Sequence, residues 1–150
     1  MLNKLFNQTD EISAERAQAE ENNEPVEETE PFINALVLLP TRELAVQVLK
    51  VLDKILENLE GEENQKNYRF LRCLISGGFA VEKQERLLGK TPQILIATVG
   101  RLWDLVKAGQ HPELKTLALS TFLILDEVDR ILELGQFKEL ANVLKFLDDP

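Results

Sequence analysis

Four short apolar runs, separated by longer helical patterns, constrain the fold of this chain more than any other feature of its sequence. Each run has four to six residues, which is too short for a helix and is typical of a strand buried on both faces. The runs cover residues 35–39, 70–75, 94–97 and 122–125.

Helical patterns occupy the intervals between these runs. Shorter ones cover residues 81–88, 101–108, 127–134 and 137–147. The strongest lies in residues 41–60, is followed by a helix-stopping glycine at position 61, and carries five apolar residues at helical spacing: Leu44, Val48, Leu52, Ile55 and Leu59. Strand followed by helix, repeated, predicts an α/β fold in which helices cover both faces of a parallel sheet through right-handed crossovers.

The net charge of −9 belongs mostly to the first 31 residues, which hold nine acidic and two basic residues. Residues 32–150 hold 17 acidic and 15 basic residues and are nearly neutral. Glu, Gln, Asn and Pro dominate residues 14–31, and apolar residues are too sparse there to offset the entropy of ordering. We therefore expect a disordered acidic segment over residues 1–31 and a folded domain over residues 32–150. The segment is either a solvated spacer or a tail that binds a partner.

Composition excludes several classes of protein. No apolar run approaches the roughly 18 residues that a membrane span needs. The single cysteine, Cys73, cannot form an intramolecular disulfide, and residues 1–10 lack the pattern of a secretory signal, so we expect a reducing intracellular compartment. One histidine and one cysteine are too few for a zinc site, so any metal should be a hard cation held by carboxylates and phosphates.

Ligands of parallel sheets bind beyond the carboxyl ends of the strands, so the residues after each strand are the candidates for function. Two of the strands are followed by a hydroxyl residue, an arginine and the start of a helix, and this combination makes an anion site. A third strand is followed by a glycine doublet, which lets the backbone of a ligand approach closely. Each loop alone could be a helix cap or a turn, but three on one edge favour an extended polyanion. The residues are Thr41, Arg42, Gly77, Gly78, Thr98, Gly100 and Arg101.

The fourth strand ends in Asp126-Glu127-Val128-Asp129, which is the Walker B arrangement. A strand that ends in Asp126 can hold that carboxylate where it binds Mg²⁺ on a nucleotide's phosphates. Glu127 can orient and deprotonate an attacking water. The alternative is that the acidic pair only stabilises the N-terminus of the next helix.

Together, these motifs resemble the first RecA-like domain of the DEAD-box RNA helicases, over about residues 35–147. Residues 40–45 (Pro-Thr-Arg-Glu-Leu-Ala) match motif Ia of that family, Gly77-Gly78 its glycine doublet, residues 98–101 (Thr-Val-Gly-Arg) its motif Ib, and residues 126–129 its motif II. Residues 84–88, 101–103 and 135–137 are similar to the nucleolar subgroup that acts in large ribosomal subunit assembly. That subgroup carries an acidic insertion before motif Ia, and residues 1–31 would be the end of such an insertion.

The resemblance implies a role for each motif residue. Asp126 would hold Mg²⁺ through water, Glu127 would be the base for the water that attacks the γ-phosphate, and Asp129 would couple motif II to a Ser-Ala-Thr motif. The other motif residues would hold phosphates and 2′-hydroxyls of one RNA strand without reading bases. They are Thr41, Arg42, Gly77, Gly78, Thr98, Gly100 and Arg101.

The sequence departs from the family pattern in three ways. Val99 stands where the family usually has Pro, and Val128 where it usually has Ala. Both valines are small or medium apolar residues, and the polar residues of the two turns are the same as in the family. No Gly-x-x-x-x-Gly-Lys-Ser/Thr occurs among the 150 residues, and the Ser-Ala-Thr motif is also missing. We therefore expect a partial RecA-like P-loop NTPase domain that lacks the P-loop strand, and a 150-residue chain that is inactive by itself.

The predicted function is that of a fragment of an ATP-dependent RNA helicase, an RNA-stimulated ATPase with ATP and Mg²⁺ as cofactors. It would bind RNA through the phosphate backbone and couple ATP hydrolysis to RNA remodelling in large ribosomal subunit assembly. The expected partners are RNA and pre-ribosomal proteins, with no membrane, and the expected location is the nucleus and nucleolus. The alternative is a non-catalytic RNA- or protein-binding module that has lost the ATPase.

The remaining conspicuous residues have plainer interpretations. Trp103 is expected to pack in the core rather than stack on a base, and Cys73 to be a small buried hydrophobe. His111 is expected to be a surface residue without a catalytic role. Lys83 and Arg86 either add to the residues that contact the RNA strand or belong to a solvated helix face.

Overall fold

The computed structural model describes residues 32–60 and 71–149. The predicted disordered segment over residues 1–31 and the helix stop at position 61 lie outside the described residues. The described elements are β1 (Ala35–Leu39), α2 (Arg42–Glu60), β2 (Arg72–Ile75), α3 (Val81–Leu88), β3 (Ile94–Thr98), α4 (Val99–Ala108), the 3₁₀ helix η1 (Pro112–Leu119), β4 (Phe122–Leu125), α5 (Val128–Glu133) and α6 (Phe137–Asp148).

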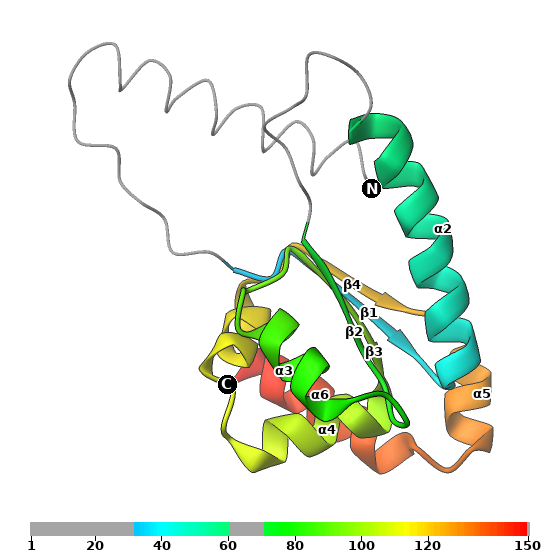
Figure 1. Cartoon of the computed structure of the whole chain (residues 1–150). Helices are drawn as coiled ribbons and strands as arrows, with labels where there is room; N and C mark the ends of the chain where they lie inside the picture. The colour runs from blue at the N-terminus through cyan, green and yellow to red at the C-terminus, as the bar shows by residue number, and fades with distance from the viewer. Residues whose placement is uncertain (1–31, 61–70, 150) are drawn as a thin grey trace. The chain divides into compact units, whose positions relative to one another are not determined.

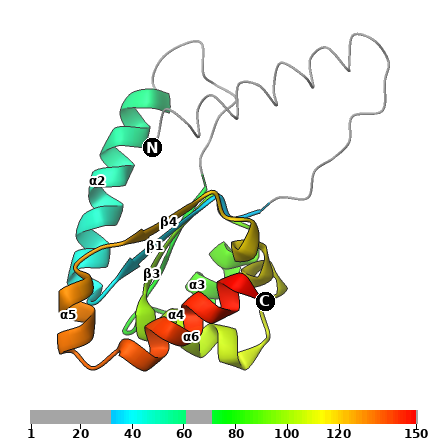
Figure 2. The same cartoon turned by 180° about the vertical axis from the view of Figure 1, so that it is seen from behind.

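The four described strands form one parallel sheet in the order β2-β3-β1-β4. Helix α2 covers one face, and α3, α4 and α6 lie on the other (Figures 1 and 2). The predicted strands and the α/β class are therefore confirmed. Because all strands run the same way, their carboxyl ends lie at one edge of the sheet.

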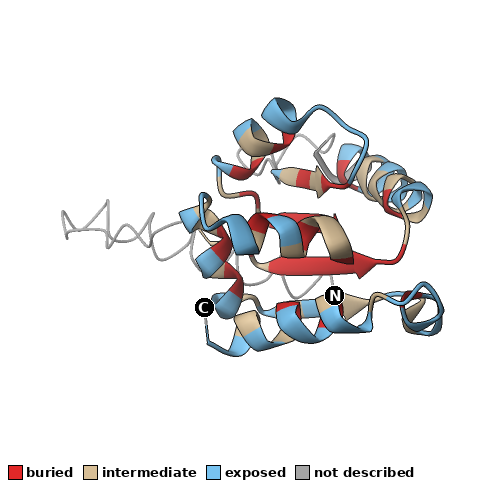
Figure 3. Cartoon of the chain, turned by 90° about the horizontal axis from the view of Figure 1, so that it is seen from below, coloured by how far each residue is buried: buried red, intermediate tan, exposed pale blue. Residues whose placement is uncertain are grey.

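The core consists of two apolar layers separated by the sheet. Ala35, Val37 and Leu39 of β1 pack under α2. Leu36 and Leu38 point to the opposite layer, which α3, α4 and α6 complete. Figure 3 shows the buried residues concentrated in the sheet and on the inward faces of the helices. Successive side chains of β1 thus point alternately into the two layers, which explains why its sequence is apolar throughout.

β2 and β4 differ from the expectation of burial on both faces, since β2 is buried only at alternate residues and β4 at none. β1 and β3 are buried at every residue, whereas β4 is only partly buried and Leu123 is 43% exposed. Among the described strands, β4 and β2 are the edges of the sheet. An apolar run therefore predicts a strand but not whether neighbours cover it, because coverage depends on strand order.

The inward face of α2 also differs in part from the predicted one. Leu44, Val48 and Leu52 pack against the sheet as expected. Ile55, however, is 37% exposed, and Leu56 is fully buried in its place. The helix has 3.6 residues per turn, so a stripe that includes position 52 continues at 56 as readily as at 55. The side chain of Leu59 lies outside the described residues.

Two local features were not expected from the sequence. Helix α4 begins at Val99, two residues before the predicted start, so Val99 and Gly100 belong to its first turn. Residues 112–119 form η1, in which Leu114 and Leu117 enter the core. A 3₁₀ segment has three residues per turn, and these leucines have that spacing without the longer period of an α-helix.

Three single-residue expectations can be compared with the structure. Trp103 is partly buried against the core, with Lys107 Nζ 5.8 Å from the ring centroid, which confirms core packing. His111 was expected at the surface, and this is wrong: its side chain is only 11% exposed, and Nε2 lies 3.8 Å from Glu85 Oε1. The loop sequence around His111 does not indicate that this residue lies close to α3. No helix in the described ranges is long and apolar enough to cross a membrane.

Cys73 is fully buried in β2, and burial raises the pKa of its thiol to about 12. The thiolate is the reactive species, so we expect the native chain to react with iodoacetamide at about pH 8 far more slowly than the urea-unfolded chain. Mass spectrometry of alkylated Cys73 against time measures both rates. Equal rates in the native and unfolded chains would contradict the burial.

Candidate functional site

The loops that follow β1, β2 and β3 surround a cavity of about 370 Å³ at the carboxyl edge of the sheet. Parallel pairing is the reason, because Leu39 is level with Thr98 and Ile75 is level with Ala97. The residues that line it are Pro40, Arg42, Ser76, Gly77, Thr98, Gly100, Arg101, Asp104 and Gln136. Most of the predicted RNA-facing residues therefore meet in one place.

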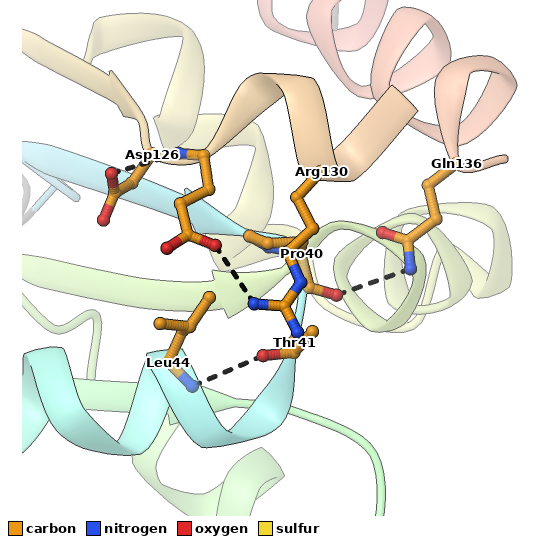
Figure 4. Close-up of polar contacts among 7 residues, drawn as sticks. Pro40, Thr41, Leu44, Asp126, Arg130 and Gln136 are labelled. Atoms are coloured by element: carbon orange, nitrogen blue, oxygen red, sulfur yellow. Dashed lines mark hydrogen bonds and ion pairs between the residues drawn. The ribbon is translucent and has the colours of Figure 1, made fainter. Parts of the chain in front are cut away.

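The loop after β1 presents Arg42 and uses Thr41 internally. The Thr41 Oγ1 accepts a hydrogen bond from the backbone N–H of Leu44, at 3.4 Å, and so caps the start of α2 (Figure 4). Thr41 is not among the residues that line the cavity. Arg42, the first residue of α2, does line it, next to the N–H groups that the helix leaves unpaired.

The glycine doublet after β2 is held by a buried polar side chain that the sequence interpretation missed. Gln84 of α3 is 4% exposed. Its Oε1 accepts a hydrogen bond from the N–H of Ser76, at 3.0 Å, and its Nε2 donates to the carbonyl of Phe79, at 3.2 Å. The available signal was a glutamine four residues before the buried Leu88 on the inward side of a short helix.

Gly78 fits its position because it has no side chain. Its φ is +77°, which is the left-handed region that favours glycine. A Cβ at this residue would collide with Nη1 of Arg42, the same atom that donates a hydrogen bond to the Gly78 carbonyl at 3.3 Å. Gly78 therefore contacts Arg42, which lines the cavity, whereas Gly77 lines the cavity itself.

The loop after β3 contributes the polar side chains of Thr98 and Arg101. The hydroxyl of Thr98, the residue that precedes α4, makes no capping hydrogen bond. Arg101 forms no hydrogen bond or ion pair within the described ranges. Asp104, the acidic lining residue, is paired with Lys107 at 3.1 Å. Two arginines, one of them without a partner among the described residues, and two helix N-termini therefore give the cavity the character of an anion site.

Gln136, which joins α5 to α6, also lines the cavity and was not predicted to do so. Its Nε2 donates to the carbonyl of Pro40 at 3.4 Å and so ties the start of α6 to the end of β1 (Figure 4). Its Oε1 is buried without a partner in the described structure. No local pattern indicates this contact, since the two residues are 96 positions apart.

The carboxylates after β4 lie outside this cavity. Asp126 is exposed, and its Oδ1 accepts a hydrogen bond from the N–H of Glu127 at 3.0 Å. Glu127 has a φ of +49°, unusual for a residue with a side chain, and its Oε2 lies 3.4 Å from Nη1 of Arg130 (Figure 4). Asp129 is exposed in the first turn of α5. A strained backbone that presents a carboxylate is frequently found at functional sites.

These carboxylates fit a hard cation only in part. Asp126 is an exposed oxygen donor at a strand end, which suits Mg²⁺. Within the described ranges, however, no group of three or more His, Cys, Asp or Glu residues could hold a metal ion. The remaining ligands would have to be water and phosphate oxygens, as in nucleotide sites. Asp126 therefore fits magnesium bound with a nucleotide better than magnesium alone.

Gly78 and Gly100 make a matched pair for a test of stability. We expect Gly78→Ala to lower the free energy of unfolding by about 1 kcal/mol, because alanine is strained at positive φ, and to displace Arg42. Gly100→Ala should instead be neutral or stabilising by up to about 1 kcal/mol, because Gly100 is helical and its Cβ would meet no atom. Urea unfolding measures both, and equal effects would contradict the argument.

Comparisons with known proteins agree with this geometry. A sequence model of the DEAD/DEAH box helicase family matches residues 11–150. The ATP-dependent RNA helicase DDX24 of Mus musculus is 42% identical over 114 residues, which are 76% of this chain and 12% of the relative. The ATP-dependent RNA helicase mak5 of Emericella nidulans is 39% identical over 122 residues, which are 81% of this chain and 15% of the relative.

A solved structure supports the same assignment. The yeast DEAD-box splicing factor Prp28 is 32% identical with a TM-score of 0.68, over 79% of this chain and 25% of that one. The chain spans only 12% of the length of DDX24 and 15% of the length of mak5. The parallel sheet is accordingly part of a RecA-like domain, and the chain belongs to the DEAD/DEAH box helicase family.

Proposed function

We propose that residues 32–150 are a partial first RecA-like domain of an ATP-dependent RNA helicase and carry its RNA-binding edge. The observation that supports this most is the convergence of Arg42 and Arg101 on one cavity, each at the start of a helix. Helix starts offer free N–H groups and the positive end of the dipole, and arginine adds a planar fork for phosphate.

The proposed ligand is the phosphate backbone of one RNA strand. Gly77 and Gly100 leave room for a backbone at the cavity, since a Cβ at either would meet no protein atom. Thr98 is 9% exposed, lines the cavity and makes no capping hydrogen bond, so its hydroxyl would be the group that binds a phosphate or a 2′-hydroxyl there. Groups of this kind fix the position of a strand without reading its bases, so binding should be independent of sequence.

ATP and Mg²⁺ belong to the proposal through the residues after β4. Magnesium would neutralise charge that develops on the phosphates during hydrolysis. Asp126 would hold the ion through water, and Glu127 would take the proton of the attacking water. Arg130 holds the Glu127 carboxylate at 3.4 Å, and Asp129 would couple this segment to a Ser-Ala-Thr motif elsewhere in the protein. Through these residues the protein would couple ATP hydrolysis to RNA remodelling.

The proposed setting is assembly of the large ribosomal subunit in the nucleolus. It rests on the resemblance of residues 84–88, 101–103 and 135–137 to the nucleolar subgroup, and on an acidic segment before motif Ia. Pre-ribosomal proteins would then be additional partners. Residues 1–31 would form a disordered acidic segment that precedes the partial domain over residues 32–150.

A non-catalytic RNA- or protein-binding module is the second candidate. One observation favours it: the 150 residues contain the RNA-facing motifs but no Gly-x-x-x-x-Gly-Lys-Ser/Thr. That loop supplies the backbone donors and the lysine for the β- and γ-phosphates, and Asp126 with Glu127 cannot replace them. A P-loop in the same polypeptide favours the helicase, and its absence from the full gene product favours the module.

If Arg42 and Arg101 both contact the RNA backbone, and so form an RNA track, their substitution should have similar effects on RNA binding. Arg42→Ala and Arg101→Ala should each weaken binding of two unrelated single-stranded RNAs about tenfold, because each removes a charge-assisted hydrogen bond to phosphate. Each should also lower the slope of log affinity against log salt by about 0.7. Filter binding at several salt concentrations measures both quantities.

Lys145→Ala is the charge-matched control for these variants. Lys145 is exposed near the end of α6 and is not among the residues that line the cavity. It should leave the affinity nearly unchanged. A folded Arg42→Ala or Arg101→Ala protein with unaltered affinity and salt slope would remove that arginine from the track.

The lack of a P-loop predicts that the 150-residue chain neither binds ATP tightly nor hydrolyses it above background. Titration with a fluorescent ATP analogue and Mg²⁺ measures binding, and release of phosphate measures turnover. Glu127→Gln is the control, since it removes the proposed base with little change in shape. Micromolar affinity, or turnover that Glu127→Gln abolishes, would show that other residues supply the missing phosphate contacts.

A further inference from the structure

Phe79 places an apolar side chain beside the candidate RNA site, in contact with Arg42. It follows the glycine doublet directly and is 37% exposed. Its ring centroid lies 4.2 Å from Cζ of Arg42, within the range of a cation–π contact. Arg42 also donates through Nη1 to the carbonyl of Gly78 at 3.3 Å. The guanidinium is therefore held by two neighbouring residues of the β2–α3 loop.

The loop that carries Phe79 is itself fixed from the core side. Buried Gln84 donates to the Phe79 carbonyl and accepts from the Ser76 N–H, so it joins both ends of the turn. Breaking either bond would leave a buried polar group without a partner, which is unfavourable. The Phe79 backbone is thus anchored on its inner side while the ring stays at the surface against Arg42.

The contacts of Arg42 leave most of its hydrogen-bonding capacity unused. A guanidinium has five N–H donors, and the described contacts of Arg42 use one of them. The side chain is long and exposed, so without a support it would lose rotamer freedom on binding a phosphate. A ring beneath the guanidinium removes part of that loss in advance and leaves the other donors available.

We propose that Phe79 is a positioning residue for RNA binding: it holds the Arg42 guanidinium at the cavity, ready for a backbone phosphate, with Gln84 fixing the loop. This inference rests on the proposed RNA-binding function of the cavity. It assigns Phe79 an effect through Arg42 and not through a base. The competing role for an exposed aromatic ring is direct stacking on an RNA base, which would be independent of Arg42.

A double-mutant cycle in the 150-residue chain separates the two roles. The proteins are the unsubstituted chain, Phe79→Leu, Phe79→Tyr, Arg42→Ala and the Arg42→Ala/Phe79→Leu double variant, with short single-stranded RNA at low salt as the probe. Phe79→Leu should weaken binding about two- to fivefold, the size of an exposed cation–π contact. Phe79→Tyr keeps the ring and should bind as the unsubstituted chain does.

The decisive comparison is the effect of Phe79→Leu in the Arg42→Ala background. It should be absent there, because the group that Phe79 positions is gone. An equal loss in both backgrounds would show direct contact with RNA and would overturn the inference. Val81→Ala is the matched control: it removes exposed apolar surface two residues away and has no contact with Arg42 among those described, so it should not change affinity. Thermal midpoints of all variants exclude loss of folding.

A second measurement needs no RNA and separates failure of this inference from failure of the proposed function. The NMR signal of the Arg42 Nε–H should be shifted by the ring current of Phe79, and Phe79→Leu should move it to the position typical of a free arginine. An unshifted signal in the unsubstituted chain would overturn the inference even if RNA binds. Failure of the unsubstituted chain to bind RNA, with the signal shifted as expected, would overturn the proposed track and, with it, the role of Phe79 in RNA binding.

Discussion

The parallel pairing of β1 between β3 and β4 is the constraint on which the rest of this structure depends. It aligns Leu39 with Thr98 and Leu38 with Leu125, so the neighbouring strands end at nearly the same level. Three loops that are far apart in the chain therefore open at one edge. Because β1 and β3 are buried at every residue, a one-residue slip in this register would exchange the side chains that face the two layers of the core.

The edge is divided by strand order into two chemically different parts. β2, β3 and β1 carry the loops that form the cavity with Arg42 and Arg101, and β4, on the other side of β1, carries Asp126 and Glu127. Arg42 and Arg101 are thus kept apart from Asp126 and Glu127, and in the proposed function the first region would take a backbone phosphate and the second a metal–nucleotide complex. The end of β1 lies between them, where Gln136 binds the Pro40 carbonyl (Figure 4).

Side-chain amides, one of them buried, hold the loops that present these groups. Gln84 fixes the turn that contains the glycine doublet, and Gln136 fixes the end of β1. Neither is a group that would donate charge to a ligand. Gln84 joins Ser76 to Phe79, and breaking either of its two bonds would leave a buried polar group unpaired, whereas Gln136 joins the start of α6 to the end of β1 through one bond. Positioning of the arginines therefore depends on uncharged side chains in the layer behind them.

The sequence by itself determined the strands, most helix boundaries, the parallel sheet and the motif residues, because apolar periodicity and turn chemistry are local properties of the chain. It misjudged β4, Ile55 and His111, whose exposure depends on which elements lie beside them.

Only the tertiary structure showed that Gln84, Gln136 and Phe79 belong to the site and that Thr41 is used as a helix cap. These roles are contacts between segments such as Pro40 and Gln136, which are 96 residues apart. Local patterns carry no information about such contacts, since they arise when the folded sheet aligns the ends of its strands.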